Sequence, residues 1–320
     1  VSTVFTSDTT AYVVPEVTDL SGDAVISPSI TEGGSEIVIA GDYFGPLGVN
    51  SDIQAHYGPS GSPNKYTATN CAVSSSQTEI RCNTIPGVGS GLMWSVTVGG
   101  QGSGVLTSKT TRYANPTVST LSGAAVDADG TATTGGADIV LTGTNFGPAN
   151  AGTSISVYYG PVSEPKKYDA TAGCTVSLAH TTVTCKTVAG VGANLKWQVE
   201  IEGQASIASS STTKYIVPSI NGLSGDAMAA SGTTTYGGAA ISISGTNFGP
   251  SSHTEVAAQY GPPGSTEKYT ATGCAVISQT EITCVTAPGV GKDLRWSVTV
   301  GAQVSTVFTS DTTAYVVPEV

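Results

Sequence analysis

Three segments of this sequence are copies of one another, spaced about 100 residues apart. Each copy reads Gly-Gly, a short alternating apolar run and then Phe-Gly-Pro, and the copies lie at residues 33–46, 135–148 and 237–250. A Tyr-Gly-Pro, a cysteine pair, a Gly-rich loop and a Trp-led strand pattern follow each copy in the same order. A chain with this repeat is expected to fold as a row of three similar modules rather than around one large core.

The alternation of apolar and polar residues predicts that each module is all-β. From Trp94 to Val98 every second residue is large and apolar, and the same pattern begins at Trp197 and Trp296. Such a strand buries one face and exposes the other, which makes the tryptophans core anchors. No stretch keeps helical apolar spacing over three turns. These features predict about seven short strands per module in a two-sheet sandwich.

The combined motifs resemble the IPT/TIG family of immunoglobulin-like domains, found in plexins, in Rel-type transcription factors and in large cell-surface proteins. The resemblance recurs three times and covers essentially the whole chain. It implies three tandem immunoglobulin-like β-sandwiches in a rod. It says little about function, because the family serves as receptor stalk, DNA-contacting domain and enzyme appendage. The second copy departs from the pattern at Ala189, where the others have Pro86 and Pro288.

A Tyr-x-x-Pro motif marks the end of each copy and sets the expected domain boundaries. We expect residues 1–14 to be the final strand of a preceding repeat, 15–115 and 116–217 to be the first two sandwiches, and 218–320 to be the third with the start of the next repeat. No Gly/Ser linker surrounds the prolines, which predicts semi-rigid junctions. The junction residues are Tyr12, Pro15, Tyr113, Pro116, Tyr215, Pro218, Tyr315 and Pro318.

The six cysteines form three closely spaced pairs, which are Cys71 and Cys82, Cys174 and Cys185, and Cys274 and Cys284. Folded as a hairpin, the first pair places Val73 opposite Ile80, Ser74 opposite Glu79, and the turn at residues 76–77. The two cysteines of a pair then face each other within disulfide distance. Three disulfides imply an oxidising compartment, so we expect the protein to be extracellular or at the cell surface.

Charge and motif content argue against other functions. The net charge is −11, and the 12 scattered Lys and Arg residues would repel a phosphate backbone, which excludes a nucleic-acid partner. The three histidines do not recur at equivalent positions, no Cys-x-x-Cys occurs, and no nucleophile is paired with a recurring His. We therefore expect no cofactor, no metal site and no enzyme. A calcium site near Asp127, in the run Asp-Ala-Asp-Gly, is left open.

The remaining partner expectations come from composition. No apolar stretch is long enough to cross a membrane, so no membrane insertion is expected in this segment. The Ser/Thr-rich edges allow O-linked glycans. Low charge and small surface residues would let identical rods contact one another sideways.

The same seventeen residues stand at Val1 to Val17 and at Val304 to Val320. The stretch before the Tyr-x-x-Pro motif varies freely between the copies, so the fold does not require this identity. We interpret the chain as one 303-residue period, with overlap, of a longer tandem array. A duplicated end and a strand donated to a neighbouring subunit are the alternatives.

These observations predict a structural protein that continues head to tail in the same chain and contacts identical chains laterally. The expected role is a subunit of an extracellular filament or cell-surface appendage. The alternative is an adhesin or receptor stalk whose binding module lies outside this sequence or on loops near Tyr57, Tyr159 and Tyr260.

Overall fold

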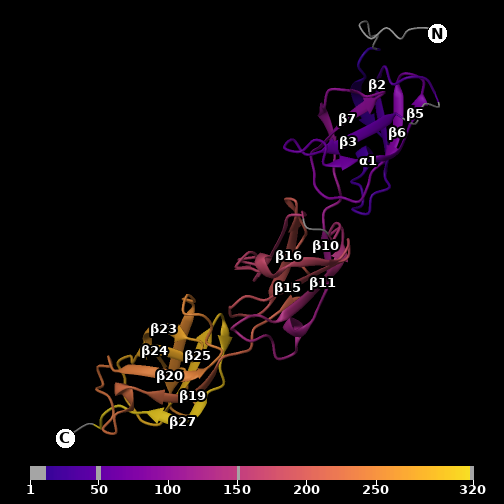
Figure 1. Cartoon of the computed structure of the whole chain (residues 1–320). Coiled ribbons are helices and arrows are strands. Elements are labelled where there is room, and N and C mark those ends of the chain that lie inside the picture. The colour runs from indigo at the N-terminus through magenta and orange to yellow at the C-terminus, as the bar shows by residue number, and fades with distance from the viewer. Residues whose placement is uncertain (1–11, 48–51, 150–151, 318–320) are drawn as a thin grey trace, which may run out of the picture.

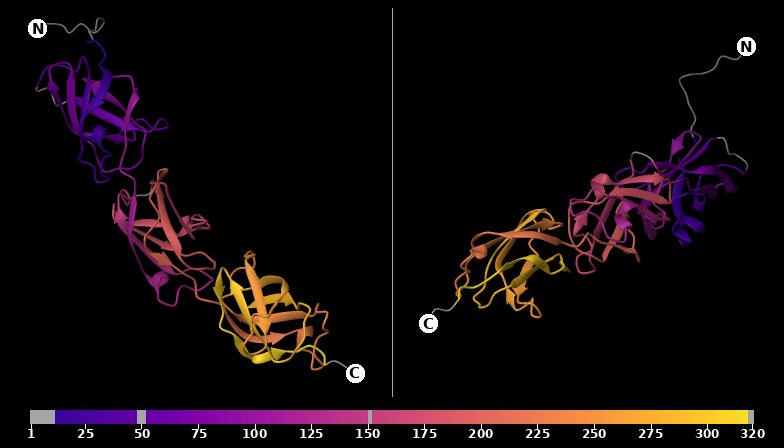
Figure 2. Two further views of the ribbon diagram at one scale, coloured as in Figure 1. Left: turned by 180° about the vertical axis from the view of Figure 1, so that it is seen from behind. Right: turned by 90° about the horizontal axis from the view of Figure 1, so that it is seen from below.

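Three β-sandwiches follow one another in a single row along the chain. The computed structural model describes residues 12–47, 52–149 and 152–317 (Figure 1). The row is extended in each view, with the N-terminal sandwich at one end and the C-terminal sandwich at the other (Figure 2). Most of the strand predicted at residues 1–14, and Pro318, lie outside the described residues.

Within the residues that the structure describes, each sandwich contains nine strands, and we call the sandwiches modules 1, 2 and 3. Module 1 contains β1 (Glu16–Ser21), α1 (Asp23–Ile26), β2 (Glu36–Asp42), β3 (Ile53–Gly58), β4 (Tyr66–Thr67), β5 (Thr69–Ser75), β6 (Glu79–Asn83), β7 (Leu92–Val98), β8 (Gln101–Gly102) and β9 (Leu106–Thr111). Module 2 contains β10 (Thr117–Ser122), η1 (Ala124–Val126), β11 (Asp138–Thr144), β12 (Ile155–Gly160), β13 (Tyr168–Asp169), η2 (Thr171–Gly173), β14 (Thr175–Leu178), β15 (Thr182–Lys186), β16 (Leu195–Ile201), β17 (Gln204–Ala205) and β18 (Thr212–Thr213). Module 3 contains β19 (Ser219–Ser224), η3 (Asp226–Met228), β20 (Ala240–Thr246), β21 (Val256–Gly261), β22 (Tyr269–Thr270), β23 (Thr272–Ser278), β24 (Glu281–Val285), β25 (Leu294–Val300), β26 (Gln303–Val304) and β27 (Phe308–Thr313).

The sheet topology is the same in all three modules. In module 1 a four-stranded sheet has the order β1-β2-β6-β5, and a five-stranded sheet has the order β4-β3-β7-β8 with β9 also paired to β7. Modules 2 and 3 repeat both orders, and the strand pairs are antiparallel. The helices are short single turns. The predicted all-β tandem sandwich is therefore confirmed.

An aromatic stack fills the centre of each module. In module 1 the Trp94 ring stacks on Tyr57 with centroids 4.2 Å apart, and both side chains are fully buried. The Trp94 indole N–H donates to Thr111 Oγ1 at 2.9 Å, so the ring's one polar atom is satisfied. Trp197 and Trp296 make the same stack in modules 2 and 3.

Each cysteine hairpin carries one disulfide. The bonds join Cys71 to Cys82, Cys174 to Cys185 and Cys274 to Cys284, and each pair has its Cα atoms 4.1 Å apart. The bridge ties the edge strand of the four-stranded sheet to its neighbour in modules 1 and 3, and in module 2 it joins β15 to the residue just before the edge strand β14.

The first cysteine hairpin departs from its predicted register beside the turn. Val73 lies opposite Ile80, as the prediction had it. A β-bulge then places Ser75, instead of the predicted Ser74, opposite Glu79, and the turn comprises residues 76–78.

The bulge has a tertiary cause in the turn residue Gln77. Its backbone φ is +67°, and its carbonyl accepts the N–H of Phe44 at 3.1 Å. Phe44 belongs to the Phe-Gly-Pro motif of the same module and is fully buried. The turn is therefore shaped by the neighbouring loop rather than by the hairpin alone.

Candidate functional site: the joints between modules

Six of the predicted junction residues belong to the module interiors, whereas Tyr12 is 90 % exposed at the entry to module 1. Tyr113 is buried in module 1, where its hydroxyl lies 2.8 Å from that of Tyr57. Tyr215 repeats this contact with Tyr159 at 2.6 Å. The following prolines, Pro116 and Pro218, are also buried, as is Pro15 at the entry to module 1. Tyr315 is buried in module 3 in the same way.

A valine from each Gly-rich loop is inserted into the next module. Val88 of module 1 is 4 % exposed and belongs to the apolar core of module 2. Val191 of module 2 is 3 % exposed and belongs to the core of module 3. Cores that share a side chain restrict how the two modules can rotate, because the packed valine must leave its site for the joint to bend.

A glycine of the Phe-Gly-Pro motif receives each valine. A Cβ added to Gly147 would collide with Cγ1 of Val88, and one added to Gly249 would collide with Cγ1 of Val191. Both glycines also have a positive φ, +79° and +83°. The glycine therefore serves two purposes, since it makes the turn and leaves room for the neighbouring module.

A glutamine side chain spans each joint next to the valine. The Gln303 amide group donates to the carbonyl of Tyr215 at 2.9 Å, and its Oε1 accepts the N–H of Gly192 at 3.1 Å. Gln204 makes the first of these bonds at the preceding joint, to the Tyr113 carbonyl at 2.9 Å. Gln303 and Gln204 are both buried. Each bond gives a partner to a backbone group that would otherwise be buried unpaired in the closed joint, which lowers the free-energy cost of closing the joint.

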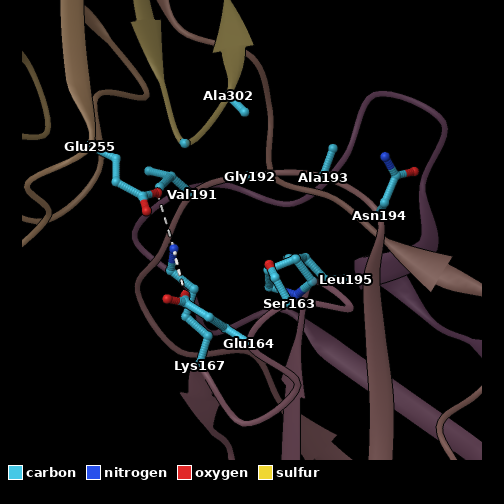
Figure 3. Close-up of a pocket in the computed structure, with 12 residues that line it drawn as sticks. Ser163, Glu164, Lys167, Val191, Gly192, Ala193, Asn194, Leu195, Glu255 and Ala302 are labelled. Atoms are coloured by element: carbon cyan, nitrogen blue, oxygen red, sulfur yellow. Dashed lines mark hydrogen bonds and ion pairs between the residues drawn. The ribbon is translucent and has the colours of Figure 1, made fainter.

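A lysine from the earlier module pairs with a glutamate of the later one. Lys65 Nζ lies 3.2 Å from Glu202, and Lys167 Nζ lies 3.2 Å from Glu255. Figure 3 shows Lys167 between Glu255 and Glu164, beside Val191, along a groove of about 460 Å³. Burial alone would lower the pKa of Lys167, but its hydrogen bonds to Glu255 and Glu164 outweigh burial and raise that pKa.

The joints also contain a threonine contact that differs between them. Thr31 Oγ1 lies 2.8 Å from Nδ1 of His180 at the joint of modules 1 and 2. At the joint of modules 2 and 3, the equivalent Thr133 bonds to Gln279 through both its hydroxyl and its carbonyl. His180 and Gln279 occupy the same turn of their hairpins, because each carbonyl accepts the N–H of the motif phenylalanine.

The tyrosines suggested as the neighbourhood of adhesive loops are not at the surface. Tyr57, Tyr159 and Tyr260 are fully buried against the tryptophans, so their side chains cannot take part in adhesion. Asp127 belongs to no group of three or more His, Cys, Asp or Glu side chains placed for a metal ion, within the residues that the structure describes. No helix in the same residues is long and apolar enough to span a membrane.

Sequence reasoning missed the residues that form the joints. The Gly-rich loop was recognised only as part of the repeat, and no role was predicted for the glutamine after each Trp-led strand. Two signals were present: an apolar Val between two glycines in all three copies, and a Gln that recurs at Gln101, Gln204 and Gln303. Neither pattern indicates which module the valine or the glutamine side chain contacts.

The sequence matches one family model. Residues 226–315, which form most of module 3, match the IPT/TIG domain. Modules 1 and 2 repeat its topology and its motifs. No curated protein matches the chain.

Solved structures of similar fold are distant in sequence. A surface glycan-binding protein from Prevotella bryantii is 11 % identical, with 78 % of this chain and 66 % of that chain covered and a TM-score of 0.40. The FN1–FN3 domains of chicken CNTN1 are 11 % identical, covering 95 % of this chain and 99 % of that one, with a TM-score of 0.28. The Escherichia coli adhesin FdeC is 17 % identical, covering 93 % and 99 %, with a TM-score of 0.24.

Proposed function

We propose that this chain of IPT/TIG-type sandwiches is a structural unit of an extracellular filament or cell-surface appendage, with a mechanical and not a catalytic role. The observation that carries the proposal is the insertion of Val88 and Val191 into the core of the following module. A joint with a shared core transmits bending and torsion from module to module, whereas a flexible linker would not.

Three disulfides support a location outside the cytoplasm. All six cysteines are paired, and each bridge closes a short hairpin at a sheet edge. Such bonds persist in oxidising environments. They also oppose local opening of the edge-strand hairpin in each module.

The alternative is a stalk that presents a binding module encoded elsewhere. A stalk and a filament both require stiff joints, so they differ in lateral association and not in the joint. Molecules spread on a grid distinguish them: single separate strings favour the stalk, and ordered bundles or helices favour the filament.

The tandem-array part of the proposal is tested by the mass of the native polypeptide under reducing and denaturing conditions. The sequence shown here has a mass of 32.0 kDa. A native mass far above this value supports an array of such units. A mass near it would contradict the array and would direct attention to strand exchange between subunits.

The stiffness part is tested by small-angle X-ray scattering of the 320-residue chain. We expect an extended particle of one length, and we expect Val191→Asp to shorten and broaden the distance distribution, because a buried carboxylate is strongly disfavoured. Val290→Asp is the matched control, since Val290 stands at the same loop position in module 3 and is 58 % exposed. Equal flexibility of wild type and Val191→Asp would contradict the proposed role.

A further inference from the structure

We propose that module 3 of one copy packs on module 1 of a second copy and forms a third joint. The contact would use the face of module 1 that points away from module 2 and the face of module 3 that points away from module 2, which we call the outer faces. The inference rests on the proposed function and adds the contacts by which successive units would be joined. It follows from comparing the residues of each outer face with the residues at equivalent repeat positions in the internal joints.

The outer face of module 1 has an open site where the internal joints hold a valine. Gly45 is the equivalent of Gly147 and Gly249, has a φ of +87°, and has open space where a Cβ would stand. It lines a groove of about 400 Å³ together with Gly99, which also faces open space. Gly99 is the equivalent of Gly301, which contacts Val191 at the internal joint.

The polar groups of this face already have the positions that they take in a closed joint. The Gln101 amide group donates to the carbonyl of Tyr12 at 2.9 Å, as Gln303 does to Tyr215. Gln77 Oε1 accepts the N–H of Gly45 at 3.3 Å, as Gln279 accepts that of Gly249 at 3.2 Å. Binding a partner here therefore requires little rearrangement of module 1.

The outer face of module 3 presents the matching loop in the matching conformation. Both backbone groups of Val290 are held by the Tyr269 hydroxyl, at 3.1 Å for the N–H and 2.8 Å for the carbonyl. Tyr168 holds Val191 in the same way, at 3.0 and 2.7 Å. Val290 nevertheless is 58 % exposed, and Thr235, the equivalent of the buried Thr133, is exposed as well.

The charges of the two outer faces are complementary. Lys268 is the equivalent of Lys65 and Lys167, and its Nζ lies 5.1 Å from the centre of the Tyr269 ring. The internal joints take their carboxylate from one of two positions, that of Glu202 or that of Glu255. In module 1 the first position is Gly99 and the second is the exposed Asp52, so Asp52 is the partner assigned to Lys268.

Module 3 of another copy of this unit brings the whole set of groups to the groove, and its set is not already used in an internal joint. The occupant must supply a valine in a Gly-rich loop, a lysine beside it and a threonine for Gln77, and module 3 supplies all three as Val290, Lys268 and Thr235. The sequence is continuous as well, since residues 304–320, which contain the last strand β27 of module 3, are identical to residues 1–17, which lead into β1 of module 1.

The test uses a polypeptide of two units that share the seventeen-residue stretch. Negative-stain electron microscopy measures the distribution of angles at each joint. We expect the boundary between units to be as narrow as the internal joints. Val290→Asp in the first unit should widen the boundary alone, to the width of an unrestrained linker, and Val191→Asp in the same unit should widen only the internal joint.

Three results separate this inference from the proposed function. A wide boundary beside narrow internal joints would overturn the third joint and leave the stiff rod intact. Wide internal joints in the wild type would overturn the rod itself. A narrow boundary that ignores Val290→Asp would also overturn the inference, and an unchanged thermal midpoint of the single unit carrying this substitution shows that module 3 still folds.

The charge pairing has its own test in the same two-unit chain. Lys268→Glu in the first unit and Asp52→Lys in the second should each increase the fraction of molecules bent at the boundary. The two substitutions together should restore the wild-type fraction. Two losses that add without any restoration would contradict the pairing of Lys268 with Asp52.

Discussion

The two internal joints share their apolar contact and their glutamine but differ in their other polar groups. The carboxylate comes from Glu202, between β16 and β17, at the first joint and from Glu255, just before β21, at the second. The threonine partner is His180 in one and Gln279 in the other. The positions of the valine and its glycine are thus fixed by shape, whereas the carboxylate that pairs with the lysine can come from either of two loops.

This difference follows from the physics of the two kinds of contact. A valine fits only where a Cβ is absent, so its site allows one arrangement. The ion pairs are partly exposed, with side-chain exposures of 22 % for Lys167 and 61 % for Glu255. Such pairs contribute up to about 1 kcal/mol and tolerate several geometries.

The largest expected effect is a loss of stability in one module interior, with the joints unchanged. Replacing Cys71 and Cys82 together by Ala should reduce the free energy of unfolding of module 1 by about 3 kcal/mol, because the disulfide restricts the unfolded chain. Calorimetry should show a lower thermal midpoint for one module, with the scattering profile unchanged below it. An unchanged midpoint would contradict the stabilising role of the bridge.

Alkaline pH should weaken the interiors through the buried tyrosines. Burial raises the pKa of Tyr159 to about 12, although its hydrogen bond to Tyr215 opposes this. An unfolded tyrosine ionises near pH 10, so this contribution to stability is complete below about pH 10 and is lost as the pH rises towards about 12.

Thermal midpoints measured across this pH range check the expectation, with tyrosinate absorbance as the second readout. Tyr159→Phe should make the midpoint of module 2 less dependent on pH. The hydrogen bonds of Lys167 to Glu255 and Glu164 raise the pKa of this lysine and so help to keep it charged at alkaline pH. Equal pH dependence of wild type and Tyr159→Phe would refute the assignment.

Removal of a joint glutamine should have a smaller effect, and one confined to its joint. Gln303→Ala leaves the Gly192 N–H and the Tyr215 carbonyl without their partner. The expected cost is about 1–3 kcal/mol of joint stability. Faster hydrogen exchange at Gly192, with unchanged exchange in the strands of module 3, is the measurement. Gln101→Ala is the control, because Gln101 lies on the outer face of module 1.

The smallest effect tests the comparison between the joints most directly. Glu202→Gly should weaken the joint of modules 1 and 2 by no more than about 1 kcal/mol, and less at high salt. Adding Ser154→Glu supplies the carboxylate from the position that Glu255 has in module 3 and should recover the loss. The distribution of interdomain angles, measured with and without added salt, checks both the loss and the recovery. A double variant with a joint no stiffer than that of Glu202→Gly would argue against interchangeable carboxylate positions.

Local patterns in the sequence predicted the interior of each module. The alternation around Trp94 gives the buried face of a strand, because side chains in a strand point alternately to its two faces. The cysteine spacing gives the disulfide, because the hairpin brings residues near in sequence together. The one error of register, at Ser75, occurred where a residue outside the hairpin, Phe44, bonds to its turn.

The sequence by itself determined three all-β modules, the Trp-led strand of each module and the cysteine pairs, since each of these depends on a pattern within a short stretch. The tertiary structure decided the joints. Their contacts connect residues 111 apart, as between Gly192 and Gln303, or 149 apart, as between Thr31 and His180. No periodicity encodes such a distance. A Val between two glycines is typical of an ordinary exposed loop. Only the packing of the adjacent module shows that this valine is buried.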